Sequence, residues 1–177
     1  MPGKARPQKT PFETAVAMLS RRPYSVAELR RALQKKFPAS EDIPGIIARL
    51  RELGYLDDSR FAEAYASSLA RVRNYGRRRI RRELKSKLVD YRVIDRAVEN
   101  ALTAGDEREL LERAVDKKIR TLRKPLTRAR LASLCQSLIR RGFRADDIMK
   151  AIRSRPELHF DSEDIRSADL EEQEREG

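Results

Sequence analysis

Signals for the start of a helix recur along this sequence and constrain its fold more than any other feature. Thr10-Pro11-Phe12-Glu13 joins an N-cap threonine to a proline at the first helical position and a glutamate at the third. This arrangement is a capping box. Ser25-Val26-Ala27-Glu28 is a second, and Asp106-Glu107-Arg108-Glu109 is a version headed by aspartate. A chain with so many helix starts has little room for strands.

Glycines and prolines supply the matching stops. Gly54, Gly105 and Gly142 each follow a run of helix-periodic apolar residues, where a glycine commonly ends a helix. Pro125 and Pro156 mark further stops. Starts and stops together predict an all-α chain of nine helices with short connections, at residues 11–20, 26–36, 41–53, 58–73, 77–88, 91–103, 107–123, 128–141 and 145–154.

The predicted helices fall into three groups with the same apolar pattern. The middle helix of each group carries one pair of apolar residues, repeated at spacings of 51 and 54 residues: Leu29 and Leu33, Ile80 and Leu84, Leu134 and Leu138. We therefore predict three tandem three-helix repeats, at 10–57, 58–105 and 106–155, in an elongated or curved array. Residues 1–9 and the acidic tail 156–177 are predicted to be disordered. Flexibility between repeats is the default expectation.

The charge of the chain is strongly positive and uneven. The net charge is +12, but residues 161–177 hold eight acidic residues against two arginines, so residues 1–160 carry +18. Such a field favours a polyanionic partner over a merely soluble basic protein. An anionic membrane is disfavoured, because no long apolar stretch or lipidation motif accompanies the charge. The single cysteine excludes an internal disulfide, and no secretory segment is evident, so we expect a cytoplasmic protein.

The densest basic segment runs from Arg71 to Lys87, where nine of seventeen residues are Arg or Lys and Glu83 is the only acid. Like charges one helical turn apart repel, and a solvated helix face normally mixes signs. Contact with a polyanion explains the segment better than solvation alone, and the loop residue Tyr75 could stack on a base. The predicted contact residues are Arg71, Arg73, Tyr75, Arg77, Arg78, Arg79, Arg81, Arg82 and Lys85.

Two further basic clusters follow. One surrounds the end of the seventh predicted helix, where part of it could instead complement the helix dipole. One cluster per repeat predicts a basic stripe rather than a point site. The predicted contact residues are Lys117, Lys118, Arg123, Lys124 and Arg128 in the first cluster and Arg140, Arg141 and Arg144 in the second.

Residues with catalytic or metal-binding chemistry are sparse. The only histidine, His159, lies in the predicted tail, and Cys135 falls on an apolar helix face, where burial is expected. No Cys/His set has zinc spacing, and no glycine-rich loop could cradle a phosphate. The adjacent carboxylates Asp57 and Asp58 are explained as the N-cap and first turn of a helix. Neither an enzyme nor a protein with a cofactor or a metal is expected.

Three segments resemble motifs of the bacterial RecX family, one after another in the expected order. Gly54-Tyr55-Leu56-Asp57-Asp58-Ser59-Arg60-Phe61-Ala62-Glu63-Ala64-Tyr65 resembles the family signature. The run from Gly76 to Leu84 resembles the motif of the second repeat, and Leu138-Ile139-Arg140-Arg141-Gly142-Phe143 resembles that of the third. One departure is Lys87-Leu88-Val89, where the family usually has a glycine in the middle position. A glycine C-cap is therefore missing.

The resemblance implies three tandem three-helix repeats, binding in the groove of the RecA filament, and modulation, usually inhibition, of RecA recombinase and ATPase activity. It also implies contact with single-stranded DNA, directly or within the filament, and a role in recombination, DNA repair and the SOS response. A monomer is expected. The alternative is a three-helix module that binds DNA directly, such as a transcription or nucleoid factor, and does not act through RecA.

Overall fold

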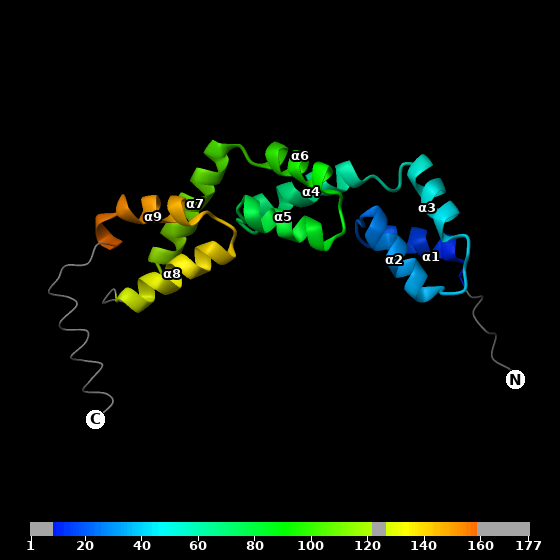
Figure 1. Cartoon of the computed structure of the whole chain (residues 1–177), viewed down its shortest axis with the longest axis horizontal. Helices are drawn as coiled ribbons and strands as arrows, with labels where there is room; N and C mark the ends of the chain where they lie inside the picture. The colour runs from blue at the N-terminus through cyan, green and yellow to red at the C-terminus, as the bar shows by residue number, and fades with distance from the viewer. Residues whose placement is uncertain (1–8, 122–126, 159–177) are drawn as a thin grey trace, which may run out of the picture. The chain divides into compact units, whose positions relative to one another are not determined.

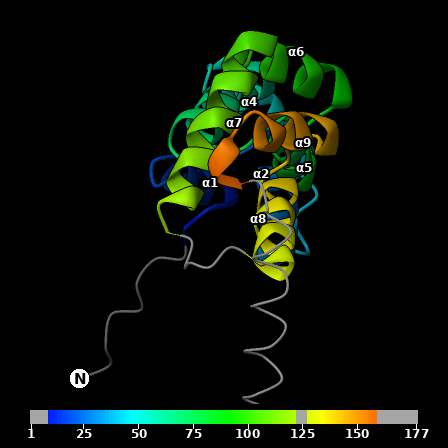
Figure 2. The same cartoon turned by 90° about the vertical axis from the view of Figure 1, so that its left-hand side faces the viewer.

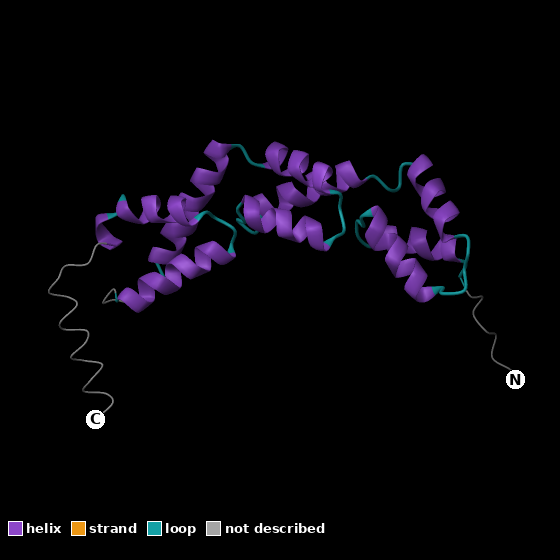
Figure 3. Ribbon diagram, in the orientation of Figure 1, coloured by secondary structure: helices purple, strands orange, loops and turns teal. Residues whose placement is uncertain are grey.

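The computed structural model describes residues 9–121 and 127–158, and the described residues contain α-helices, one 3₁₀ turn and no strand (Figures 1 and 3). The all-α prediction is confirmed. The predicted disorder of residues 1–9 and 156–177 concerns a part of the chain that lies almost wholly outside these ranges. The helices are α1 (Pro11–Leu19), α2 (Val26–Lys36), α3 (Ile43–Glu52), α4 (Asp58–Arg71), α5 (Arg77–Ser86), α6 (Tyr91–Ala101), α7 (Ala104–Ile119), α8 (Arg128–Arg140) and α9 (Ala145–Arg153), and the 3₁₀ turn is η1 (Pro156–Leu158).

Most of the predicted helix ends form as expected. The Thr10 hydroxyl accepts the N–H of Glu13, and the Glu13 carboxylate accepts the N–H of Thr10, which completes the capping box of α1. Ser25 caps α2. Gly54 and Gly142 have φ angles of +72° and +94°, in the left-handed region that favours glycine. These two glycines end α3 and α8, as predicted.

The predicted start of α7 and the predicted role of Gly105 are wrong. The hydroxyl of Thr103 accepts the N–H of Asp106, and the Asp106 carboxylate accepts the N–H of Thr103. This capping box begins three residues before the predicted one, so Asp106 is the third residue of the helix and not its N-cap. Gly105 consequently lies in the first turn of α7, while α6 ends at Ala101.

The chain divides into two compact units. The first comprises residues up to 66 together with 82–100. Its helices α1, α2 and α3 lie together (Figure 1), and their buried side chains form an apolar cluster. Leu29 and Leu33 of α2 are fully buried there against Ile46 and Leu50 of α3. The aligned apolar pair of the first repeat therefore lies in the core, as predicted.

The second unit comprises residues 67–81 and those from 101 onward. Helices α7, α8 and α9 pack on one another in this unit. Figure 2 shows them with the left-hand side of Figure 1 turned towards the viewer. Leu134 and Leu138 of α8 are buried, as are Val115 of α7, Phe143 and Ile148 of α9. Ile80 and Leu84 of α5 are also fully buried, so the apolar pairs aligned in all three repeats are internal.

Candidate partner-binding surface

Two basic segments far apart in the sequence meet where α8 ends against the start of α5. The amide N–H of Gly76 donates to the carbonyl oxygen of Arg141 at 2.9 Å. A side chain at position 142 would place its Cβ 2.3 Å from the amide nitrogen of Arg79, and one at position 76 would place it 2.8 Å from the carbonyl oxygen of Gly142. Only glycine fits at both positions. The contact therefore sets the basic runs that follow Gly76 and precede Gly142 beside each other.

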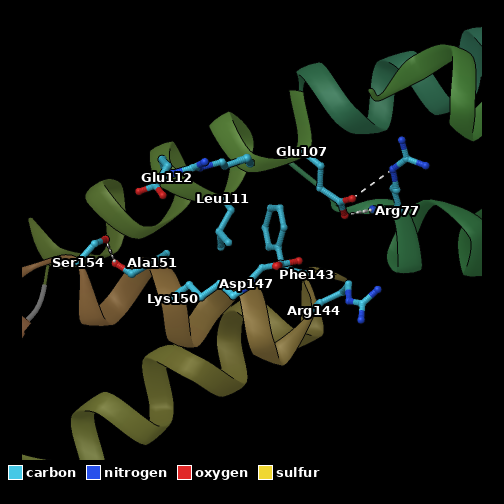
Figure 4. Close-up of a pocket in the computed structure, with 11 residues that line it drawn as sticks. Arg77, Glu107, Leu111, Glu112, Phe143, Arg144, Asp147, Lys150, Ala151 and Ser154 are labelled. Atoms are coloured by element: carbon cyan, nitrogen blue, oxygen red, sulfur yellow. Dashed lines mark hydrogen bonds and ion pairs between the residues drawn. The ribbon is translucent and has the colours of Figure 1, made fainter. Parts of the chain in front are cut away.

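Arg77 is engaged within the molecule at this contact (Figure 4). Its backbone N–H donates to one carboxylate oxygen of Glu107 at 2.9 Å, and its guanidinium Nε pairs with the other at 3.2 Å. The guanidinium also donates to the carbonyl of Leu102. One carboxylate thus caps the N-terminus of α5 and neutralises its first arginine. The predicted contact between Arg77 and a partner stays a prediction.

Tyr75 and Arg79 occupy each other at the same place. The Arg79 guanidinium carbon lies 5.3 Å from the centre of the Tyr75 ring, and Tyr75 is half-buried. Asn74, with φ +52°, turns the chain from α4 towards Tyr75. The cation–π contact covers a ring face that a base would need. Stacking of a nucleobase on that face of Tyr75 therefore requires Arg79 to move.

Five other arginines around the α5–α8 contact face solvent. Arg71, Arg73, Arg78 and Arg140 are exposed, and none has an acidic partner among the residues that the structure describes. Arg144 is exposed and lies 3.7 Å from Asp146. We call these five residues the arginine surface. All five belong to the second unit, and their charge is compensated at only one position.

The other predicted contact residues are distributed more widely. Arg82 and Lys85 are exposed on α5, one and two turns beyond Arg78, whereas Arg81 is half-buried. Lys117 and Arg128 are exposed, and Lys118 and Arg141 are half-buried. Arg123 and Lys124 lie outside the described residues. The structure therefore gathers part of the predicted stripe near the α5–α8 contact and leaves the α7 cluster as a separate prediction.

A cavity of about 500 Å³ opens between α7 and α9 beside the arginine surface (Figure 4). Its apolar floor is formed by Leu111, Phe143 and Ala151, all nearly inaccessible to solvent. Charged side chains form the rim, and among them Glu112 is held by Arg155. Burial disfavours the charge of Arg155, but its bonds to Asp116 and Glu112 outweigh burial and raise its pKa. No pattern in the sequence indicates this cavity, because it depends on how two helices pack.

A second contact between repeats lies in the first unit. The Ser25 hydroxyl donates to the carbonyl oxygen of Lys87, and the N–H of Val26 donates to the Asp58 carboxylate at 2.9 Å. The neighbouring Asp57 caps α4, because its carboxylate accepts the N–H groups of the second and third residues of that helix. Asp57 thus has the predicted capping role, while Asp58 caps α2 of the preceding repeat.

Glu28 adds an ionic link to this contact. Its carboxylate lies 3.1 Å from both the Arg22 guanidinium and the Lys87 ammonium. Partial burial by itself would raise the pKa of Glu28, but the hydrogen bonds from Arg22 and Lys87 outweigh it and hold the pKa below its ordinary value. The carboxylate is therefore stabilised in its charged form.

Cys135 is half-buried on α8, less enclosed than the sequence predicts. Burial still raises the pKa of its thiol, which disfavours the reactive thiolate. Among the described residues, no cluster of three or more His, Cys, Asp or Glu side chains could hold a metal ion. In the same part of the chain, no helix is both long and apolar enough to cross a bilayer.

Fold and surface together define a class of protein: tandem three-helix repeats that present uncompensated arginines. Three family models match the chain in order. They describe the first three-helix domain of RecX at residues 12–50, the second at 57–98 and the third at 106–152. The chain belongs to the RecX family.

Relatives and solved structures agree with this assignment. Regulatory protein RecX of Cronobacter sakazakii is 34% identical over 155 residues, which cover 81% of this chain and 90% of the relative. Regulatory protein RecX of Streptomyces coelicolor is 30% identical over 154 residues, covering 85% and 81%. The crystal structure of RecX from Lactobacillus salivarius matches with a TM-score of 0.69 at 23% identity, over 81% of this chain and 93% of that one, and shows the same fold.

Proposed function

We propose that this chain binds the RecA–single-stranded DNA filament and inhibits its recombinase and ATPase activity, thereby regulating recombination and DNA repair. Membership of a family of regulatory proteins supports the role. The observation that carries the proposal is the arginine surface, because four of its five side chains lack an acidic partner among the described residues. The protein would act as a cytoplasmic monomer.

The chemistry of the arginine surface suits such a target. A filament on single-stranded DNA presents phosphates and acidic side chains, and the planar guanidinium group binds both types of oxyanion through paired hydrogen bonds. Each phosphate neutralised also releases condensed counterions, so affinity rises as salt falls. Contacts from adjacent repeats add to one another, because the second binds at a high effective concentration once the first is bound.

Inhibition follows if the bound chain prefers one state of the filament. A ligand shifts a conformational equilibrium only by its differential affinity for the two states. A protein that spans several protomers and holds them in one arrangement slows any step that must change that arrangement. ATP turnover in the filament is such a step, and its rate is the direct readout.

The test titrates the protein into RecA on single-stranded DNA and follows ATP hydrolysis. We expect the rate to fall in a saturable manner. Reversing two charges of the arginine surface, Arg78→Glu with Arg140→Glu, should weaken the effect. A matched double reversal on exposed α2 residues, Arg30→Glu with Arg31→Glu, should weaken it far less. Equal weakening in both doubles would mean that total charge matters and not this surface.

A parallel arm measures binding to the same DNA without RecA. Binding that is strong and salt-sensitive but unchanged by RecA, with no effect on ATP hydrolysis, would replace the proposal with the alternative of a direct DNA-binding module.

A further inference from the structure

The contacts in the two units share one construction. In each, the N-terminus of the middle helix of one repeat receives a backbone carbonyl that follows the middle helix of the next repeat. Ser25 donates to the carbonyl of Lys87, and Gly76 donates to that of Arg141. The donors are 51 residues apart and the acceptors 54, the spacings of the aligned apolar pairs. The two contacts therefore occupy equivalent positions in the repeat.

A carboxylate completes each contact in the same way. The first backbone N–H of α2, at Val26, donates to Asp58 in the first turn of α4. The first backbone N–H of α5, at Arg77, donates to Glu107 near the start of α7. Each carboxylate comes from the first helix of the following repeat and meets the positive end of a helix dipole. We call each set of a carbonyl and a carboxylate bond a joint.

We propose that Glu107, Gly76 and Gly142 are positioning residues, which fix the end of α8 against the start of α5 and so present the arginine surface in one geometry. Backbone atoms of the two segments approach more closely at the joint than any Cβ would permit. The Glu107 carboxylate holds both the backbone and the side chain of Arg77. The linkage between the second and third repeats is thus a fitted joint and not a flexible tether.

Steric closeness separates this joint from an ordinary helix end. Gly142 and Gly54 both have left-handed φ angles and both end helices. A Cβ at position 54 would meet nothing within 4 Å, whereas one at position 142 would strike the backbone of Arg79. Asparagine tolerates left-handed backbone. Gly→Asn changes at the two positions therefore differ chiefly in the clash that the Cβ at position 142 makes with the backbone of Arg79. Gly76→Ala adds a Cβ that would clash with the carbonyl oxygen of Gly142, at a position without a positive φ.

The proposal stands whatever partner the chain binds, and its test needs none. Spin labels are attached in a Cys135→Ser background at Ser68→Cys on α4 and Ser133→Cys on α8, two exposed positions of the second unit. Pulsed electron–electron double resonance then measures the distribution of distances between the labels. We expect one narrow distribution in the parent and in Gly54→Asn. Gly76→Ala and Gly142→Asn should shift or broaden it while circular dichroism keeps the parental helix signal.

Variants of Glu107 test the role of its carboxylate without adding a Cβ at either glycine. Glu107→Ala should broaden the distribution, and Glu107→Gln, which keeps an acceptor for the Arg77 N–H, should restore part of the order. Glu109→Ala is the matched control, since Glu109 is exposed on the same helix and its one ion-pair partner within 9–121 and 127–158 is Arg113. A broad distribution in the parent, or a narrow one unchanged in Glu107→Ala and Gly76→Ala, would overturn the proposal. If Gly142→Asn fails to fold, the other two variants decide.

Discussion

Leu88 adopts a backbone conformation that leucine seldom occupies. Its φ is +59°, and it stands at the position aligned with Gly142, 54 residues further on. The left-handed turn therefore forms at both aligned positions, with glycine at 142 and with leucine at 88. A left-handed turn strains a residue with a Cβ by about 1–2 kcal/mol.

Replacing Leu88 by glycine should stabilise the protein. The strain is relieved, while the side chain is 46% exposed and little apolar surface becomes newly accessible. Glycine is also more flexible in the unfolded chain, which offsets part of the gain. We expect a net increase of about 0.5–1 kcal/mol in the free energy of unfolding, measured by urea titration.

Leu53→Gly is the matched control for this change. Leu53 is 54% exposed at the end of α3 but has an ordinary φ of −76°. The substitution there relieves no strain and should destabilise the protein. Destabilisation by Leu88→Gly as well would mean that packing of the leucine outweighs its strain.

Glu28 should make the joint in the first unit sensitive to acid. Its folded pKa is held below the ordinary value of 4.5, so its contribution to stability is complete above that pH. The contribution disappears as pH falls through the lowered folded value and the carboxylate becomes protonated. Glu28→Gln should therefore lower stability at neutral pH and flatten the loss of stability below about pH 4.5, measured by thermal unfolding across pH. Parallel curves for the variant and the parent would contradict this.

At the scale of helices, α5 carries its exposed charges as one row. Reversing Arg78, Arg82 and Lys85 to glutamate should leave the fold intact, because exposed substitutions away from special contacts change stability by about 0.5 kcal/mol or less. Repulsion along the row would also be relieved. Binding should weaken by roughly 1.5–3 kcal/mol for each charge-assisted hydrogen bond that the reversal removes. Its salt dependence should fall if those bonds are to phosphates.

The measurement compares melting temperature with affinity for the RecA filament and for bare single-stranded DNA. A larger decrease in affinity for the filament would assign the bonds to acidic side chains of RecA. A folded triple variant that binds and inhibits normally would move the site elsewhere, most directly to the cluster around Lys117, Lys118 and Arg128.

Helix positions followed from local sequence, and contacts between repeats did not. The caps and apolar spacing predicted both ends of every helix except α7 to within two residues. α7 was misplaced because Asp106 fits both an N-cap and the third position of a helix, and only the pairing with Thr103 decides between them.

The joints escaped prediction because their partners are distant in the sequence. Nothing in the pattern around Arg77 distinguishes an arginine bound to Glu107, thirty residues on, from one facing solvent. The same limit applies to the glycines, since Gly54 and Gly142 look alike as helix stops and only Gly142 is pressed against another backbone.

At the scale of the whole chain, the acidic segment 161–177 lies outside the described residues, and its role is a prediction from charge. Its net charge of −6 accompanies a body of +18, so it should compete with an anionic partner for the basic surface at low salt. Deleting residues 161–177 should tighten binding to single-stranded DNA in low salt and have little effect at high salt. Unchanged affinity at both would leave the segment as a solubilising appendage.

The joint also has a consequence for the two outer repeats. A further joint would need a free hydrogen-bond donor at the start of one middle helix. It would also need a left-handed turn after the end of another. In the third repeat, the position aligned with Ser25 and Gly76 is Arg130. It lies inside α8, and its N–H already donates to the Thr127 hydroxyl. In the first repeat, the position aligned with Leu88 and Gly142 is Phe37, whose φ of −130° is not left-handed. Neither outer repeat therefore offers a further three-helix unit the backbone geometry that forms the two joints.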